Sequence, residues 1–152
     1  MTGAKSHRLS LKRRSMGPRA VSIETLLRRA EAAAESVARD FSAYAGTRLE
    51  DVRRLAQEAL ADRHDAEKWT ALRIALRDLQ TSSAMAGAAW ISRYAGTLHG
   101  ELEKRETTDR HLPQLVALHL DAVRIAASGA ASEDALAELD DKLNRAALSL
   151  QH

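Results

Sequence analysis

Histidine is the residue type of this chain best suited to nucleophilic, acid–base or metal chemistry, because the 152 residues include no cysteine. The histidines are spread widely along the sequence: His7, His64, His99, His111, His119 and His152. His111 and His119 lie eight residues apart, so they could share a helix face only if that helix began before Pro113. No glycine-rich phosphate loop accompanies them. We therefore predict no catalytic centre, no metal site and no cofactor.

A candidate binding motif begins at Arg77, where the sequence reads Arg-Asp-Leu-Gln-Thr-Ser-Ser-Ala-Met-Ala-Gly. This stretch resembles the pattern of histidine-phosphotransfer (HPt) domains, His-x-Leu-Lys-Gly-x-x-x-x-x-Gly. Leu79 and Gly87 match the leucine and the second glycine of that pattern. Arg77, Gln80 and Thr81 replace the acceptor histidine, the lysine and the first glycine. The chain therefore resembles a degenerate HPt domain that lacks its phosphorylated residue.

The resemblance covers about residues 40–128. Trp90, Tyr94, Leu98 and the pair Leu102-Glu103 resemble the helix that follows the acceptor helix in the family. The family is a helical bundle in which the acceptor histidine lies in the middle of a helix, on its exposed face. The resemblance thus implies an exposed position for Arg77.

The chemistry of arginine limits what Arg77 can do. A guanidinium stays protonated and has no free lone pair, so it cannot accept a phosphoryl group as an imidazole does. It can bind a carboxylate or a phosphate with two parallel hydrogen bonds. The resemblance therefore implies a non-catalytic protein that binds a response-regulator receiver domain or a sensor histidine kinase and modulates a two-component phosphorelay. The expected partner-binding residues share one helix face: Arg73, Arg77, Gln80, Thr81 and Ala84.

Three alternatives remain open. The chain could transfer phosphate through another histidine, for which His99 is the best-placed candidate. It could instead be a structural or adaptor bundle in which residues 22–45 pair with a second chain to form a homodimer. A third alternative is nucleic-acid binding through the basic N-terminus, which we consider the weakest.

The composition indicates an α-helical protein. Apolar residues make up 45% of the chain, but only 3% are aromatic. Alanine and leucine favour helices, whereas the β-branched and aromatic residues that strands favour are scarce. No apolar run reaches the roughly 18 residues of a membrane helix, and the N-terminus lacks the apolar region of a secretory signal. We expect a cytoplasmic protein with no membrane partner.

The charges are distributed unevenly. Residues 1–21 hold six of the 23 basic residues and no acidic residue, and they include Gly3, Gly17 and Pro18. The remaining chain has 17 basic and 21 acidic residues, so it is mildly acidic. We predict a disordered basic tail over residues 1–21, followed by a single helical domain over residues 22–152.

Apolar residues recur at spacings of three and four through the rest of the chain, as on one face of a helix. The stripes run through Ile23, Leu27, Val37, Phe41 and Tyr44; Leu49, Val52, Leu55 and Leu60; Trp69, Leu72, Leu76 and Leu79; Trp90, Ile91, Tyr94, Leu98 and Leu102; Leu115, Val116, Leu120 and Val123; and Leu136, Leu139, Leu143 and Leu150. The first two stripes belong either to one long helix or to two helices that break at Gly46. This pattern predicts an antiparallel helical bundle, an HPt-like four-helix core with extra N- and C-terminal helices.

Polar and special residues predict where the helices begin and end. Ser22, Asp65 and Ser132 are suitable N-caps, and Pro113 suits a first turn. Gly87 and Gly129 are expected to stop helices. The charged run 101–110 is expected to be exposed to solvent.

Overall fold

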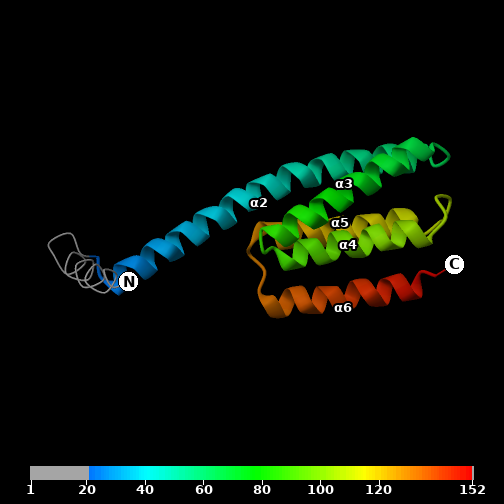
Figure 1. The fold of residues 1–152 in the computed structure, drawn as a ribbon. Helices are drawn as coiled ribbons and strands as arrows, with labels where there is room; N and C mark the ends of the chain where they lie inside the picture. The colour runs from blue at the N-terminus through cyan, green and yellow to red at the C-terminus, as the bar shows by residue number, and fades with distance from the viewer. Residues whose placement is uncertain (1–20, 152) are drawn as a thin grey trace, which may run out of the picture. The chain divides into compact units, whose positions relative to one another are not determined.

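The computed structural model describes residues 21–151, and over this range all the regular secondary structure is α-helix. Its helices are α2 (Ile23–Ala61), α3 (Ala66–Met85), α4 (Ala89–Lys104), α5 (Leu112–Ser128) and α6 (Glu133–Ser149) (Figure 1). This confirms the prediction of an all-α fold. No described helix is both long and apolar enough to cross a membrane. The predicted basic tail, apart from Val21, lies outside the described residues.

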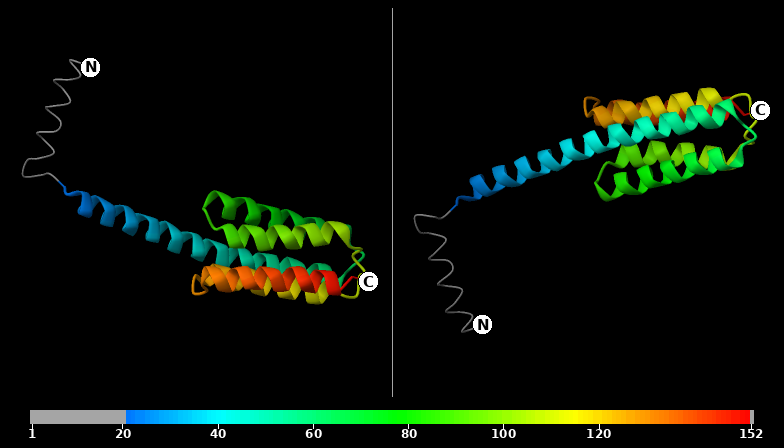
Figure 2. Two further views of the ribbon diagram at one scale, coloured as in Figure 1. Left: turned by 90° about the horizontal axis from the view of Figure 1, so that it is seen from below. Right: turned by 90° about the horizontal axis from the view of Figure 1, so that it is seen from above.

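Helix α2 is continuous through Gly46, so the alternative of two helices that break there is wrong. The chain nevertheless divides into two units, one that ends at Arg39 and one that begins at Asp40. In the first unit, the large apolar side chains Ile23, Leu26, Leu27 and Val37 of α2 are exposed. The second unit is a bundle in which the later part of α2 and helices α3 to α6 run alternately up and down (Figure 2).

The helix starts agree with the predicted caps. Ser22, Asp65 and Ser132 each accept a hydrogen bond from a main-chain N–H of the following turn, at 3.0 or 3.1 Å. These bonds satisfy N–H groups that have no partner within the helix. Pro113 lies in the first turn of α5, where a missing N–H costs nothing.

Two glycines end helices as the sequence predicts. Gly87 follows α3 with a φ of 78°, and Gly129 caps α5 with a φ of 72°. Side chains other than glycine rarely adopt this left-handed conformation. Each glycine therefore allows the chain to reverse within a few residues and bring the next helix alongside.

One hydrophobic core joins all the helices of the second unit. Its largest covered side chains are Trp69, Leu72, Leu76, Leu79, Tyr94, Leu98, Leu112 and Leu115. The Tyr94 hydroxyl donates a hydrogen bond to the Leu136 carbonyl oxygen at 2.5 Å, which ties α4 to α6. Trp69 is buried as predicted, whereas Trp90 is only half-buried. The predicted stripes supply most of this core, but Ile23, Leu27 and Val37 of the first stripe are exposed.

The prediction that the charged run 101–110 is exposed is wrong for three of its charged residues. The side chains of Glu101, Arg105 and Asp109 are each only 7% exposed. Arg105 pairs with both carboxylates, at 3.4 and 3.0 Å, and also donates hydrogen bonds to the carbonyls of Ala147 and Leu150. Because the last carbonyls of a helix lack partners within it, the C-terminus of α6 gives a buried guanidinium two further acceptors.

Candidate functional site

The predicted partner-binding residues lie on one side of α3. Arg77, Thr81 and Ala84 are exposed, and Arg73 and Gln80 are half-buried. The opposite side of α3 carries the core residues Trp69, Leu72, Leu76, Leu79 and Ser83. The 3.6-residue period of the helix therefore separates the apolar stripe from the predicted face.

The two motif residues with predicted structural roles hold this helix and its turn. Leu79 is 1% exposed in the core, and its carbonyl accepts a hydrogen bond from the buried Ser83 hydroxyl at 2.6 Å. Gly87 supplies the left-handed turn into α4. These residues fix the position of the exposed face but do not contribute to it.

Gln80 has a different role from that expected. A Cβ atom placed on Gly96 of α4 would lie 2.5 Å from the Gln80 Nε2 atom. The Gln80 side chain therefore covers a position on α4 that has no side chain of its own. This half-buried amide packs between two helices, so it is less available to a partner than Arg77 or Thr81.

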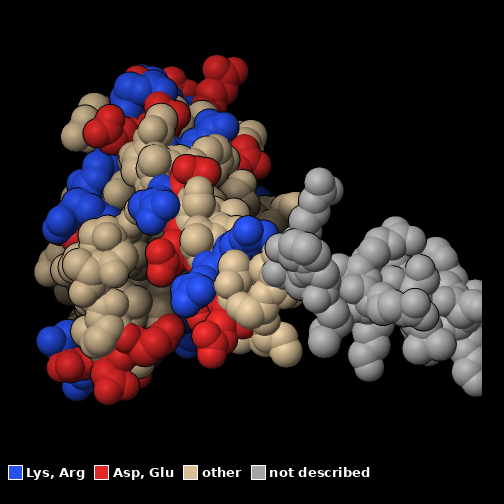
Figure 3. All heavy atoms as spheres, turned by 90° about the vertical axis from the view of Figure 1, so that its left-hand side faces the viewer, with Lys and Arg blue, Asp and Glu red and all other residues tan. Residues whose placement is uncertain are grey.

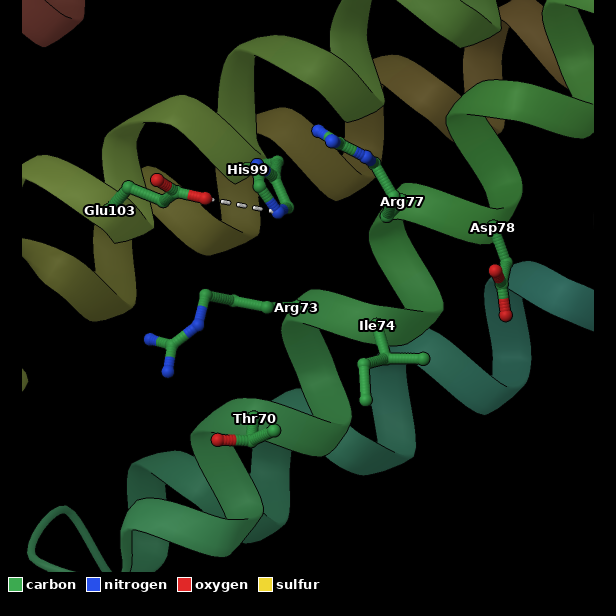
Figure 4. Close-up of a pocket in the computed structure, with 7 residues that line it drawn as sticks. All are labelled: Thr70, Arg73, Ile74, Arg77, Asp78, His99 and Glu103. Atoms are coloured by element: carbon green, nitrogen blue, oxygen red, sulfur yellow. Dashed lines mark ion pairs between the residues drawn. The ribbon is translucent and has the colours of Figure 1, made fainter.

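The two arginines border a shallow groove of about 310 Å³ between α3 and α4 (Figure 4). Helix α3 contributes Arg73 and Arg77, one turn apart, and α4 contributes His99 and Glu103, also one turn apart. In Figure 4 the Arg77 side chain extends toward α4, whereas Asp78 points away toward α2. The groove thus combines basic groups from two helices that the sequence analysis treated separately.

His99 is the member of this groove that sequence reasoning did not place there. Its Nε2 atom lies 3.4 Å from Glu103 Oε1, and its side chain is 14% exposed against 60% for Glu103. The spacing of His99 and Glu103 by four residues, on a helix expected to run antiparallel to the one with Arg73 and Arg77, is the signal that could have brought them together.

The arginines of the groove are unpaired within the described part of the chain. Neither Arg73 nor Arg77 forms an ion pair with another residue in 21–151. The same groove also contains two carboxylates, those of Asp78 and Glu103. Two free guanidinium groups can each bind a carboxylate or phosphate in a bidentate manner.

Ile74 follows Arg73 on α3, borders the same groove and is 57% exposed. It also borders a second groove, of about 340 Å³, between α2 and α3. Sequence reasoning missed Ile74 because it falls outside the apolar stripe of α3. Its charged neighbours on α3 are of both signs: Arg73 and Arg77, and Asp78 one turn further on. Protein interfaces combine apolar and polar groups in this way.

The α2 side of the second groove is held to α3 through Tyr44. The Arg48 Nε atom donates a hydrogen bond to the Tyr44 hydroxyl at 3.2 Å, and the Ser82 hydroxyl lies 3.4 Å from the same oxygen. The hydrogen bonds with Ser82 and then Arg48 lower the pKa of Tyr44. Arg48 is therefore engaged locally, unlike Arg73 and Arg77.

The charge pattern favours a local docking site over broad electrostatic attraction. On the face shown in Figure 3, acidic and basic side chains are interspersed. Over residues 21–151, no three histidine, cysteine or acidic side chains lie close enough together to hold a metal ion. Within the α3–α4 groove, Arg73 and Arg77 are the groups whose chemistry suits an anion, and Asp78 and Glu103 are the acidic groups beside them.

Comparisons with protein-family models, with curated proteins and with solved structures found no significant match to this chain.

Proposed function

We propose that this chain is a non-catalytic, HPt-like signalling protein of the cytoplasm that binds a receiver domain or a sensor histidine kinase and modulates a two-component phosphorelay. The observation that supports it is the position of Arg77: exposed, in the middle of α3, and unpaired within residues 21–151. This is where the HPt resemblance expects the acceptor histidine.

The chemistry of the groove fits such a partner. A receiver domain presents a cluster of carboxylates, one of which becomes an aspartyl phosphate. Arg77 would bind a carboxylate or phosphoryl oxygen pair, Arg73 would neutralise a second negative charge, and Ile74 would pack against apolar surface of the partner. Because arginine cannot accept the phosphoryl group, binding would occupy the partner without discharging it.

Calorimetric titration of candidate receivers and kinases tests this proposal. Arg77→Ala should weaken binding by roughly 10- to 100-fold, since hydrogen bonds to charged groups contribute about 1.5–3 kcal/mol each. Arg77→Lys should recover only part of the affinity, because an ammonium lacks the planar fork. Arg124→Ala, an exposed arginine of α5, is the matched control and should leave affinity unchanged. If no receiver or kinase binds the wild-type chain, the proposal is wrong.

A second candidate function, phosphotransfer through His99, is favoured by the location of this imidazole in the groove of Arg73 and Arg77. A ring nitrogen would attack the phosphorus of an aspartyl phosphate. A P–N bond forms, the P–O bond to the aspartate breaks, and its electron pair leaves with the carboxylate. The arginines would neutralise the phosphoryl oxygens while Glu103 orients the ring.

Incubation with acetyl phosphate or with a phosphorylated receiver separates the two candidates. Acid-labile phosphate retained by the wild-type chain and lost in His99→Gln would favour phosphotransfer through His99. Receiver binding without retained phosphate would favour the non-catalytic protein.

A further inference from the structure

The N-terminal part of α2, residues 23–37, carries large apolar side chains that no other residue of 21–151 covers. Ile23, Leu26, Leu27 and Val37 are 76%, 52%, 57% and 60% exposed. Each side chain thus leaves more than half of its surface to solvent. This row lies in the unit that ends at Arg39 and is separate from the groove of α3 and α4.

Three of these side chains, together with two alanines, have the spacing of a coiled-coil seam. Ile23, Leu27, Ala30, Ala34 and Val37 follow one another at intervals of four, three, four and three residues. This heptad repeat assigns Leu27 and Ala34 to a positions and the other three to d positions. The same spacing continues in the sequence at residues 41 and 44.

We propose that residues 23–37 of α2 pair, in parallel, with the same residues of a second copy of this chain. A second copy carries an identical heptad seam, so every a and d side chain finds its counterpart at the same level. The alanines at the centre of the seam allow the two backbones to approach closely. A helix of this length is marginal in water without packing, so the pairing would also stabilise it.

The charges that flank the seam select the parallel orientation. Glu24 and Glu31 occupy e positions, and Leu26 and Ala33 occupy g positions. In an antiparallel pair, e positions face e positions, which would bring carboxylates of like charge together. In a parallel pair, e faces g, so the stem of Glu31 lies against Leu26 of the other copy. The basic residues Arg28 and Arg29 fall at b and c, outside the seam.

Two substitutions of the same kind, on opposite faces of α2, test the pairing. Sedimentation equilibrium of the full chain should show a concentration-dependent dimer. Ala34→Glu, in the seam, should weaken dimerisation at least about tenfold, since like charges face each other across a buried position. Ala32→Glu, at the outer f position, should leave it unchanged. Circular dichroism of both variants checks that the bundle is intact.

A monomeric wild-type chain at all concentrations would overturn the proposal, and so would equal loss of dimer in both variants. Dimer that persists in Ala34→Glu would place the interface elsewhere. Both alanines belong to the unit that ends at Arg39, whereas α3 and α4 belong to the other unit. Receiver binding can therefore be measured on the same proteins, so a failure of this proposal is distinguishable from a failure of the proposed function.

Cysteine cross-linking tests the orientation, since the chain contains no cysteine of its own. Under mild oxidation, Leu27→Cys should form a disulfide-linked dimer because parallel copies bring position 27 next to itself. In an antiparallel pair centred on residue 32, the two positions would be ten residues apart, about 15 Å, beyond the reach of a disulfide. Ala32→Cys is the control and should not cross-link. A dimer that fails to cross-link through Leu27→Cys would overturn the parallel arrangement.

Discussion

The Arg105 guanidinium lies 2.7 Å from the carbonyl oxygen of Leu150, a residue 45 positions later in the chain. The same side chain pairs with Glu101 and Asp109 and donates to Ala147. One buried cation thereby joins the end of α4, the following loop and the C-terminus of α6. Backbone hydrogen bonding to Arg105 fixes the last helix of the bundle to the rest.

Replacement of Arg105 by methionine should therefore destabilise the protein. Arg105→Met keeps much of the side-chain volume but leaves Glu101 without its buried partner, and removal of one member of a buried ion pair costs about 3–5 kcal/mol. Urea unfolding followed by circular dichroism measures this loss. Lys142→Met is the control, because its pair with Glu138 is more than 60% exposed and should contribute less than about 1 kcal/mol. Equal effects of the two substitutions would contradict this account of Arg105.

A second prediction concerns the pH dependence of stability. His119 is completely buried, its Nδ1 atom lies 2.7 Å from the Leu115 carbonyl oxygen, and its Nε2 atom has no hydrogen-bond partner among residues 21–151. Burial lowers the pKa of His119, against the opposing effects of the Leu115 hydrogen bond and the Glu101 charge. Arg105 also lowers it. The folded protein therefore holds this imidazole neutral where an unfolded chain would protonate it.

The direction in which stability changes with pH depends on whether the folded or the unfolded state binds the proton of His119. Above about pH 6.5, the ordinary pKa of histidine, both states are neutral at this position and stability is unaffected. As the pH falls below that value, only the unfolded state gains a proton, and the free energy of unfolding decreases by up to about 1.4 kcal/mol per pH unit. His119→Leu should flatten this dependence between pH 5 and 7, as measured by denaturation at several pH values. His64→Leu, at an exposed position, should leave the slope unchanged.

The helices and their limits were predictable because they depend on local patterns. The spacing of apolar residues, the caps at Asp65 and Ser132, and the stops at Gly87 and Gly129 each act within a few residues of the chain. The local preferences and the tertiary packing agree, because the bundle buries most of the apolar stripes that the sequence pattern predicts.

The contacts between helices could not be read in the same way. The charged run around Arg105 was expected to be exposed because the C-terminal carbonyls of α6 that bind it lie far away in the sequence. His99 and Arg77 meet in one groove only because α3 and α4 pack at a particular register. Ile74 was overlooked because an apolar residue off the stripe has no periodic signal.

A third prediction concerns the effect of Gly96→Ala on stability, because the Gln80 side chain covers Gly96. Gly96→Ala would place a Cβ atom against the Gln80 amide, which must then move. Alanine in a helix interior is also about 1 kcal/mol more favourable than glycine, so the two effects oppose each other and the single variant should be nearly neutral. In the Gln80→Ala background the obstacle is gone, and the same substitution should stabilise the protein by up to about 1 kcal/mol. A double-mutant cycle of unfolding free energies measures the difference. Equal effects of Gly96→Ala in both backgrounds would show that Gln80 does not cover this position.

The last prediction tests whether Arg77 stands where a phosphoryl acceptor belongs. Arg77→His, combined with Thr81→Gly to remove a side chain beside it, should turn the α3 face into an acceptor for phosphate from a phosphorylated receiver. The imidazole would have an uncharged nucleophilic nitrogen near neutral pH, which the guanidinium lacks. The His99→Gln substitution in all variants excludes transfer to the histidine already in the groove. Electrophoresis that retards phosphorylated proteins, before and after acid treatment, should show an acid-labile product only when Arg77→His is present. The contrary outcome is a receiver that binds the variant with Arg77→His and Thr81→Gly but transfers no phosphate to it. The partner would then bind α3 in a geometry different from that of phosphotransfer. In that case the resemblance of residues 77–87 to the HPt pattern would not indicate function.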